Sequence, residues 1–360
     1  MKNIMPESLE RIATLGMDLA KRVITLCGLD KHGEVIFRRS VAFTECYSWL
    51  SQLPKGCVVG MEACSSSNYW GQQVLALGLT ARLMPAEFVI PFRQGRGNKN
   101  DHNDALAIAI AVRQPTMRFV SVKTVEQQIR LLTHTMREGY KAERTALINR
   151  VRGILLEFGF PMAQSATRFY QGVKQALAAD TLPLVVREQV AELIAHLRAI
   201  EAQMRVCEGR IERAAKSDHL CQRSQSIVGV GALTADAISV HLSHPKVFKN
   251  GRQFAAWLGL TPSQYSTGGK PKLGRITRRG DSYCRSLLVQ GARSSLLQAE
   301  RQEPGLRNRE QRWMVALRAR IGYQKALVAI ANKHARQLWA MAVKGEHYDA
   351  DAWRQYKQAA

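Results

Sequence analysis

The stretch Ile12-Ala-Thr-Leu-Gly-Met-Asp18 is apolar until its last residue, which is an acid. A second stretch, Cys57-Val-Val-Gly-Met-Glu62, repeats this pattern. Both are typical of buried strands that end in a carboxylate, and open α/β sheets usually hold their sites at the C-terminal ends of strands. The two stretches therefore predict a sheet with two acids at one edge.

The segments around these two stretches predict a mixed α/β domain over residues 10–120. Strand-like segments at 12–19, 22–29 and 34–43, with a turn at Asp30-Lys-His-Gly33, predict three hairpin-like strands. Further strands are expected at 58–62 and 80–84, and helices near 49–50, 69–78 and 101–113. Strands that alternate with helices in this way indicate an α/β fold.

Two more acids open the last of these helices, in Asn98-Lys-Asn-Asp101-His-Asn-Asp104-Ala. Asp101 and Asp104 are one helical turn apart, so they share a face. Such a pair alone is usually solvated or caps the helix. Combined with Asp18 and Glu62 it can bind one or two hard cations, which prefer oxygen ligands, and this preference argues against His102 as a ligand. Two metals about 3.5–4 Å apart serve phosphodiester chemistry.

The composition indicates a polyanionic partner. The 360 residues include 52 Lys+Arg and 29 Asp+Glu, a formal charge of +23. Charge alone favours nucleic acid but leaves a membrane surface open. No apolar run approaches the roughly 20 residues that span a bilayer, and no signal peptide is evident, so we expect a cytoplasmic protein. A nucleic-acid partner would make it nucleoid-associated. Seven cysteines without a C-x-x-C pair predict buried, reduced thiols.

From residue 121 the pattern becomes helical, and residues 121–220 predict a coiled-coil region. Its apolar seam steps alternately by four and three residues through Val186, Val190, Leu193, Leu197, Ile200, Met204, Cys207 and Ile211. A preceding helix, about 122–158, carries a similar apolar face. An intramolecular helical hairpin and a dimerising coiled coil both fit this pattern.

Residues 221–345 predict a third, mainly helical region. Around Gly229-Val-Gly231 a helix ends and another begins. Such a turn exposes N–H groups to a DNA phosphate, although glycines also serve ordinary helix–helix turns. A short apolar helix is expected at Phe254–Leu260 and a long basic helix at about 307–343, whose arginines offer a second nucleic-acid face.

Between these helices, residues 263–281 form a polar, glycine-rich segment in which only Asp281 offsets five cations. The cations are Lys270, Lys272, Arg275, Arg278 and Arg279, and all five are candidate phosphate clamps. The segment is either a loop that only grips phosphates or a loop that also delivers a hydroxyl nucleophile. Charge alone does not separate these alternatives.

Taken in order, Gly16-Met-Asp18, Gly60-Met-Glu62-Ala and Lys99-Asn-Asp101-x-x-Asp104-Ala resemble the DEDD transposases of the IS-110 family. The later motifs, Gly229-x-Gly231, Phe254-Ala-Ala-Trp-Leu-Gly-Leu-Thr-Pro262 and Ser266-Thr-Gly-Gly-Lys270, resemble its IS-1111 subgroup. Piv-type DNA invertases are close relatives of this family. The resemblance extends from about residue 12 to residue 342.

The resemblance implies a RuvC-like, ribonuclease H-type N-terminal domain, a helical coiled-coil insertion and a mainly helical C-terminal transposase domain. It implies that the four acids hold Mg²⁺ or Mn²⁺ and that a serine attacks the DNA strand, giving a covalent protein–DNA intermediate. The implied partners are double-stranded DNA and a structured non-coding bridge RNA. The family works as a multimer, here a dimer or tetramer, in which the acids of one subunit meet the serine of another.

Two residues compete for the role of nucleophile in this resemblance. The Gly-Gly-Lys pattern favours Ser266, and an ungapped match from Pro262 to some family members favours Thr267. We assign Ser266, because a primary hydroxyl attacks with less crowding. One rival function is a metal-only RuvC-like nuclease or junction resolvase. The other, a non-catalytic nucleic-acid-binding protein, fits poorly with four intact acids.

Overall fold

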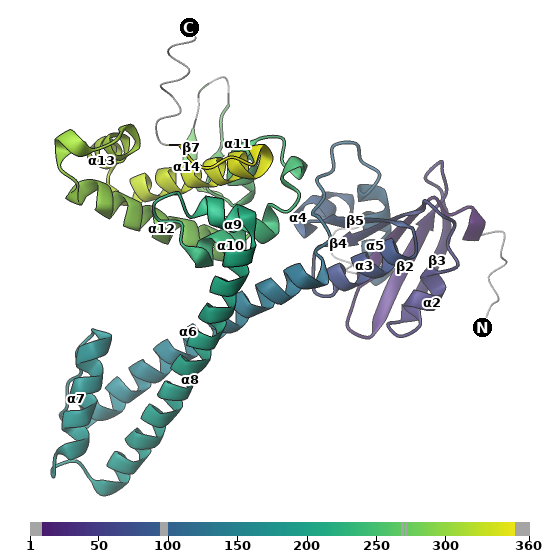
Figure 1. Cartoon of the computed structure of the whole chain (residues 1–360). Coiled ribbons are helices and arrows are strands. Elements are labelled where there is room, and N and C mark those ends of the chain that lie inside the picture. Colours follow the sequence, from purple (N-terminus) through teal and green to yellow (C-terminus); the bar gives the residue numbers. More distant parts are fainter. Residues whose placement is uncertain (1–8, 94–99, 268–269, 271, 350–360) are drawn as a thin grey trace. The chain divides into compact units, whose positions relative to one another are not determined.

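The computed structural model describes residues 9–93, 100–267, 270 and 272–349. The chain folds into two compact units, Met1–Gln128 and Ile129–Ala360, which are described separately below (Figure 1). The first unit is built on a sheet, and the second is mainly helical.

The first unit contains a five-stranded mixed sheet of order β3-β2-β1-β4-β5. Its strands are β1 (Thr14–Leu19), β2 (Val23–Leu29), β3 (Val35–Ala42), β4 (Val58–Glu62) and β5 (Thr80–Met84). β2 is antiparallel to β1 and β3, whereas β1, β4 and β5 run parallel. All five predicted strands are confirmed, and this sheet is consistent with the expected RuvC-like domain.

The helices in the described part of this unit are α2 (Cys46–Leu50), α3 (Ser67–Ala76), α4 (Ala86–Val89), the 3₁₀ turn η1 (Ile90–Phe92) and α5 (Asp101–Ala111). α5 is rich in alanine, and its residues 104–109 are buried. It packs on β1, β2 and β4. On the sheet's other face, Leu15, Met17 and Met61 enter a separate core with Trp70.

Two glycines let α5 lie directly on the sheet. Gly16 of β1 pairs in register with Gly60 of β4. A Cβ at Gly16 would lie 2.1 Å from the carbonyl oxygen of Ala105, and one at Gly60 would lie 2.9 Å from Cβ of Val112. The backbone of α5 therefore occupies space that any larger residue at Gly16 would need.

We expect Gly16→Ala to destabilise the protein by about 1–3 kcal/mol, the usual effect of overpacking a filled core. Gly139→Ala is the control, because Gly139 lies within helix α6 (Val125–Glu157) with no atom within 4 Å of an added Cβ. That variant should gain about 0.5–1 kcal/mol, since alanine favours the helix more than glycine does. Urea unfolding measures both. Equal stability of Gly16→Ala and the parent would contradict the close packing.

The second unit contains most of α6 and all the elements described after it. These are α7 (Ala166–Ala178), α8 (Leu184–Ser217), α9 (His219–Ser224), α10 (Ala232–His241), η2 (Pro245–Val247), α11 (Gly251–Trp257), β6 (Pro262–Gln264), β7 (Leu273–Ile276), α12 (Ser282–Arg301), η3 (Pro304–Leu306), α13 (Arg309–Ile321) and α14 (Tyr323–Lys344). No helix in the described ranges is both long and apolar enough to cross a bilayer.

The predicted apolar seam packs within the chain. Val190 and Leu197 of α8 share a core with Val151 of α6 and Phe169 of α7. α6 and α8 run side by side with α7 at the far end of the pair (Figure 1), and Arg144 of α6 bonds to Glu201 of α8 at 2.7 Å. The intramolecular hairpin is therefore present, and a dimerising role for these helices stays a prediction.

Two predictions for the second unit were wrong in detail. The single helix expected at 307–343 is two helices, α13 and α14, because Gly322 between them adopts a φ of +82°. The segment expected as a loop contains a two-stranded hairpin, in which Pro262 of β6 pairs with Ile276 of β7. Its strands are short and largely exposed, so they lack the alternation that identifies a strand.

Candidate metal centre and serine loop

The register of the sheet brings the two strand acids together. β1 and β4 pair Gly16 with Gly60 and Met17 with Met61, so Asp18 and Glu62 occupy the next positions on adjacent strands. Side chains alternate between the faces of a strand. The two acids therefore lie on the face that carries the two glycines, which is the face covered by α5.

The N-terminus of α5 supplies the other two acids. Asn100 caps the helix, its side-chain oxygen accepting the N–H of His102 at 3.0 Å. Asp101 is the first helical residue and is exposed, whereas Asp104 is buried, with 5% of its surface exposed. Asp104 directly precedes Ala105, which lies against Gly16. Close packing at the glycine thus sets the position of the Asp104 carboxylate.

Three of the four predicted acids converge. Asp18, Asp101 and Asp104 each offer a carboxylate oxygen, and these oxygens lie within 4.8 Å of one another. Glu62 is not a member of this group. A set of carboxylate oxygens suits a hard divalent cation such as Mg²⁺, so the donor chemistry fits the metal that the sequence predicts.

An arginine links Glu62 to the group. Nε of Arg93 lies 3.0 Å from Oδ1 of Asp104, and its Nη2 lies 3.2 Å from Oε1 of Glu62. Arg93 is not among the residues that the sequence predicts for the site. It follows η1 in a segment with no helical or strand periodicity, and only the folded chain brings it beside the acids.

One cysteine lies close to this centre. Cys64 is exposed, whereas the other six cysteines are buried, and all seven are free thiols. Partial burial, together with the nearby carboxylates of Glu62 and Asp18, raises the pKa of the Cys64 thiol. The expectation of buried, reduced cysteines is thus confirmed for six of the seven.

Ser266, the predicted nucleophile, lies in the exposed connection between β6 and β7. Its Oγ accepts two hydrogen bonds, one from Nε2 of Gln264 at 2.8 Å and one from the N–H of Lys272 at 3.2 Å. Thr267 pairs with Lys270, whose N–H donates to the Thr267 carbonyl at 3.1 Å. Lys99, Gly268 and Gly269 of the resemblance motifs lie outside the described residues.

The five predicted phosphate clamps are all exposed on this hairpin or at its base: Lys270, Lys272, Arg275, Arg278 and Arg279. The base is held by close backbone contacts. Gly259, with a φ of +69°, leaves no room for a Cβ, which would lie 2.5 Å from the N atom of Arg279. Arg285 of α12 also donates to the carbonyls of Leu258 and Arg279, at 3.0 and 2.9 Å. The base of the cationic hairpin is therefore fixed on α11 and α12.

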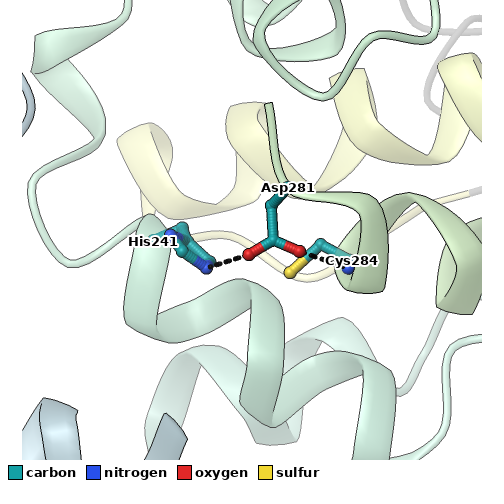
Figure 2. Close-up of side chains that lie close together, drawn as sticks. All are labelled: His241, Asp281 and Cys284. Carbon is teal, nitrogen blue, oxygen red and sulfur yellow. Dashed lines mark hydrogen bonds and ion pairs between the residues drawn. The ribbon is translucent and has the colours of Figure 1, made fainter. Parts of the chain in front are cut away.

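Asp281 connects this base to α10 (Figure 2). One carboxylate oxygen accepts the N–H of Cys284 at 2.8 Å, and the other lies 3.4 Å from Nε2 of His241. Burial raises the pKa of Asp281, but these partners lower it further, to about 2. His241, Asp281 and Cys284 have donor atoms close enough for a metal. The helix cap, the ion pair and the burial of the thiol in the core account for the cluster without one.

The two glycines of the Gly-x-Gly turn differ in backbone conformation and in packing. Gly229 adopts a φ of +87°, and a Cβ there would lie 2.2 Å from the carbonyl oxygen of Gly291 in α12. Gly231 caps α10 in an extended conformation and has no atom within 4 Å of an added Cβ. Gly229 therefore has a packing role, and the phosphate contact predicted for Gly229 and Gly231 stays a prediction.

A buried polar network ties α6 to α10 and α12. Asp236 is fully buried and accepts from Arg130 at 2.6 and 2.9 Å through one oxygen. Its other oxygen lies 2.9 Å from Nε2 of His134. Nδ1 of His134 in turn lies 2.9 Å from the hydroxyl of Tyr283, and Arg130 also bonds to Asp218 at 2.9 Å. No sequence pattern predicts this network, because its members are isolated polar residues on α6, α10 and α12 and at the cap of α9.

The structure thus combines a carboxylate centre on a mixed α/β unit with a basic hairpin on a helical unit. Comparison with known families identifies the class of protein. A model described as "Transposase IS116/IS110/IS902 family" matches residues 221–306, and a transposase model for the DEDD domain of IS110 elements matches residues 15–161. The chain belongs to the IS110 family of transposases, enzymes that cleave and rejoin DNA.

Relatives match along most of the chain. A probable family 20 transposase of Pseudomonas aeruginosa is 38% identical over 92% of this chain and 96% of its own length. The transposase of insertion sequence element IS1111A of Coxiella burnetii is 38% identical over 96% of this chain and 93% of its own length. The transposase of IS1328 of Yersinia enterocolitica is 31% identical over 93% and 98%, respectively.

Proposed function

We propose that this transposase cuts DNA by attack of Ser266, with a divalent metal held by the DEDD acids. The observation that carries the proposal is the convergence of Asp18, Asp101 and Asp104, whose oxygens lie within 4.8 Å of one another. Glu62 is the proposed fourth ligand. The metal, Mg²⁺ or Mn²⁺, would supply Lewis acidity that polarises the scissile phosphate and stabilises the departing 3′ oxygen.

The proposed chemistry is a reversible transesterification. The serine Oγ forms a bond to phosphorus, the bond from phosphorus to the 3′ oxygen breaks, and the hydroxyl proton passes to solvent while the 3′ oxygen gains one. The DNA end stays on the protein as a phosphodiester of serine. Attack by a 3′ hydroxyl on that ester reverses the step, so rejoining needs no ATP.

The contacts of Ser266 support its assignment over Thr267. Serine is a weak nucleophile until its environment activates it. Two N–H groups point at Oγ of Ser266, from Gln264 and Lys272, and such donors stabilise negative charge that develops on oxygen. The cations of the hairpin are proposed to hold the flanking phosphates.

We expect Ser266→Ala to remove all covalent protein–DNA product. Purified protein, Mg²⁺, its RNA and labelled element-junction DNA would be run on a denaturing gel, and the product is a protease-sensitive shifted band. Thr267→Ala is the matched control and should keep the band. A band lost only in Thr267→Ala would move the nucleophile by one residue. Cleavage to free 5′-phosphate ends without any band would establish the metal-only nuclease.

The proposed partners are double-stranded DNA and a structured bridge RNA, and the proposed place of action is the nucleoid. The +23 charge of the chain supports a polyanionic partner without distinguishing DNA from RNA. Recovery of one discrete RNA with the protein after a high-salt wash tests the guide. The acids and Ser266 lie in different compact units. We propose that they meet between the subunits of a dimer or tetramer.

A further inference from the structure

We propose that Arg93 is a built-in competitor of the metal: its guanidinium bridges Glu62 and Asp104 before metal binds and leaves them when it arrives. The inference rests on the proposed metal site and goes beyond it, because it assigns a role to a residue outside the four acids. Arg93 acts through the acids and is a positioning residue.

The charges of the site favour a neighbouring cation. Asp18, Asp101 and Asp104 have oxygens within 4.8 Å of one another, and Glu62 is joined to Asp104 through Arg93. Like charges this close repel strongly, the more so where water is partly excluded. The side chains of Asp104 and Glu62 are 7% and 17% exposed, so solvent screens them poorly. A positive group beside Asp104 and Glu62 therefore stabilises this arrangement.

The guanidinium of Arg93 provides this positive group. Its Nε and Nη2 atoms bond to two different carboxylates, Asp104 at 3.0 Å and Glu62 at 3.2 Å. Arginine presents such donors in a rigid planar fork that matches carboxylate oxygens, whereas the lysine ammonium is a single point charge. The contact therefore depends on the shape of the guanidinium as well as its charge.

The same contacts place Arg93 in competition with a metal. Oδ1 of Asp104 accepts from Arg93, and Asp104 is also one of the three converging acids. A divalent cation and a guanidinium on neighbouring oxygens of one carboxylate repel each other. The Arg93 side chain is 35% exposed, far more than its two partners, so it is the group that can move into solvent.

Such a competitor has a consequence for regulation. It holds Glu62 and Asp104 together in the metal-free protein, and it raises the metal concentration at which the site fills. Below that concentration these two carboxylates are paired with Arg93 and are not available to the metal.

Metal binding tests the inference without DNA or activity. Free Mn²⁺ is counted by electron paramagnetic resonance during titration of the full-length, nuclease-treated protein. Arg93→Gln should bind Mn²⁺ roughly tenfold more tightly than the parent, since a cation is removed beside the acids. Arg93→Lys keeps the charge but loses the fork, so its affinity should lie between the two. If Arg93→Gln does not fold, tighter Mn²⁺ binding by Arg93→Lys than by the parent still supports the inference, and equal or weaker binding overturns it.

Two controls separate this inference from the proposed metal site. Arg82→Gln makes the same change in net charge at an exposed position on β5, where Arg82 lies over the ring of Phe119, and should leave affinity unchanged. Asp104→Asn should lose the Mn²⁺ binding, which shows that the titration reports these acids. If the parent shows no binding sensitive to Asp104→Asn, the metal site itself is wrong. If the parent does show such binding, and Arg93→Gln binds Mn²⁺ as tightly as the parent or more weakly, only the role of Arg93 is overturned.

Discussion

Asp104→Asn is expected to lower strand cleavage at least about 10³-fold, because metal stabilisation of transition-state charge is worth several kcal/mol. Asparagine keeps the shape of the side chain and removes its charge. Asp104 is the most buried of the three converging acids, and α5 fixes its position. Cleavage of labelled element-junction DNA measures the loss. Thermal unfolding should show little change in stability, since asparagine relieves repulsion among the acids and its side-chain oxygen can still accept from Nε of Arg93.

Glu34→Gln is the control, because it neutralises an exposed acid of the same unit and should keep full activity.

A second measurement mixes Asp104→Asn with Ser266→Ala, each inactive alone. If the acids of one subunit meet the serine of another, the mixture should recover part of the parent activity. Cleavage by Asp104→Asn within tenfold of the parent would rule out the acid centre as the source of catalysis.

The second large effect is on stability. Asp236→Ala should lower the free energy of unfolding by about 3–5 kcal/mol, the usual result of breaking a buried charged pair by removing one partner. Asp236 has no exposed surface and accepts from both Arg130 and His134. Alanine leaves these two polar groups buried without their shared acceptor. Urea unfolding followed by circular dichroism measures the change.

Glu208→Ala provides the comparison, because Glu208 also pairs with an arginine of α6, Arg137, at 2.8 Å. Its side chain is 39% exposed, so this pair should be worth only about 0–1 kcal/mol. A loss for Asp236→Ala no larger than that for Glu208→Ala would show that the buried network contributes little.

The sheet and its acids could be predicted because local periodicity determines them. The repeated Gly-Met-acid pattern of residues 16–18 and 60–62 marks two strands of the same register, and the structure pairs Gly16 with Gly60. The apolar helix after Asp101 has a clear cap and a continuous buried stretch. These features depend on residues that are close in sequence, so the sequence alone predicts them.

The rest depends on contacts between distant residues. Arg93 meets Glu62, 31 positions away, and Arg130 meets Asp236, 106 positions away. Neither arginine differs locally from the other cations of a basic chain. The break at Gly322 was also missed, because a glycine inside a helical pattern is often tolerated, and its φ of +82° is seen only in the structure.

The exposure of Cys64 makes this chain ready for spectroscopic labelling. It is two residues beyond Glu62, and the other six thiols are buried, so a maleimide dye should modify one position of the unaltered protein. A fluorophore there would sit beside the carboxylate centre. Its emission could follow the arrival of metal and DNA in real time, without first removing any other cysteine.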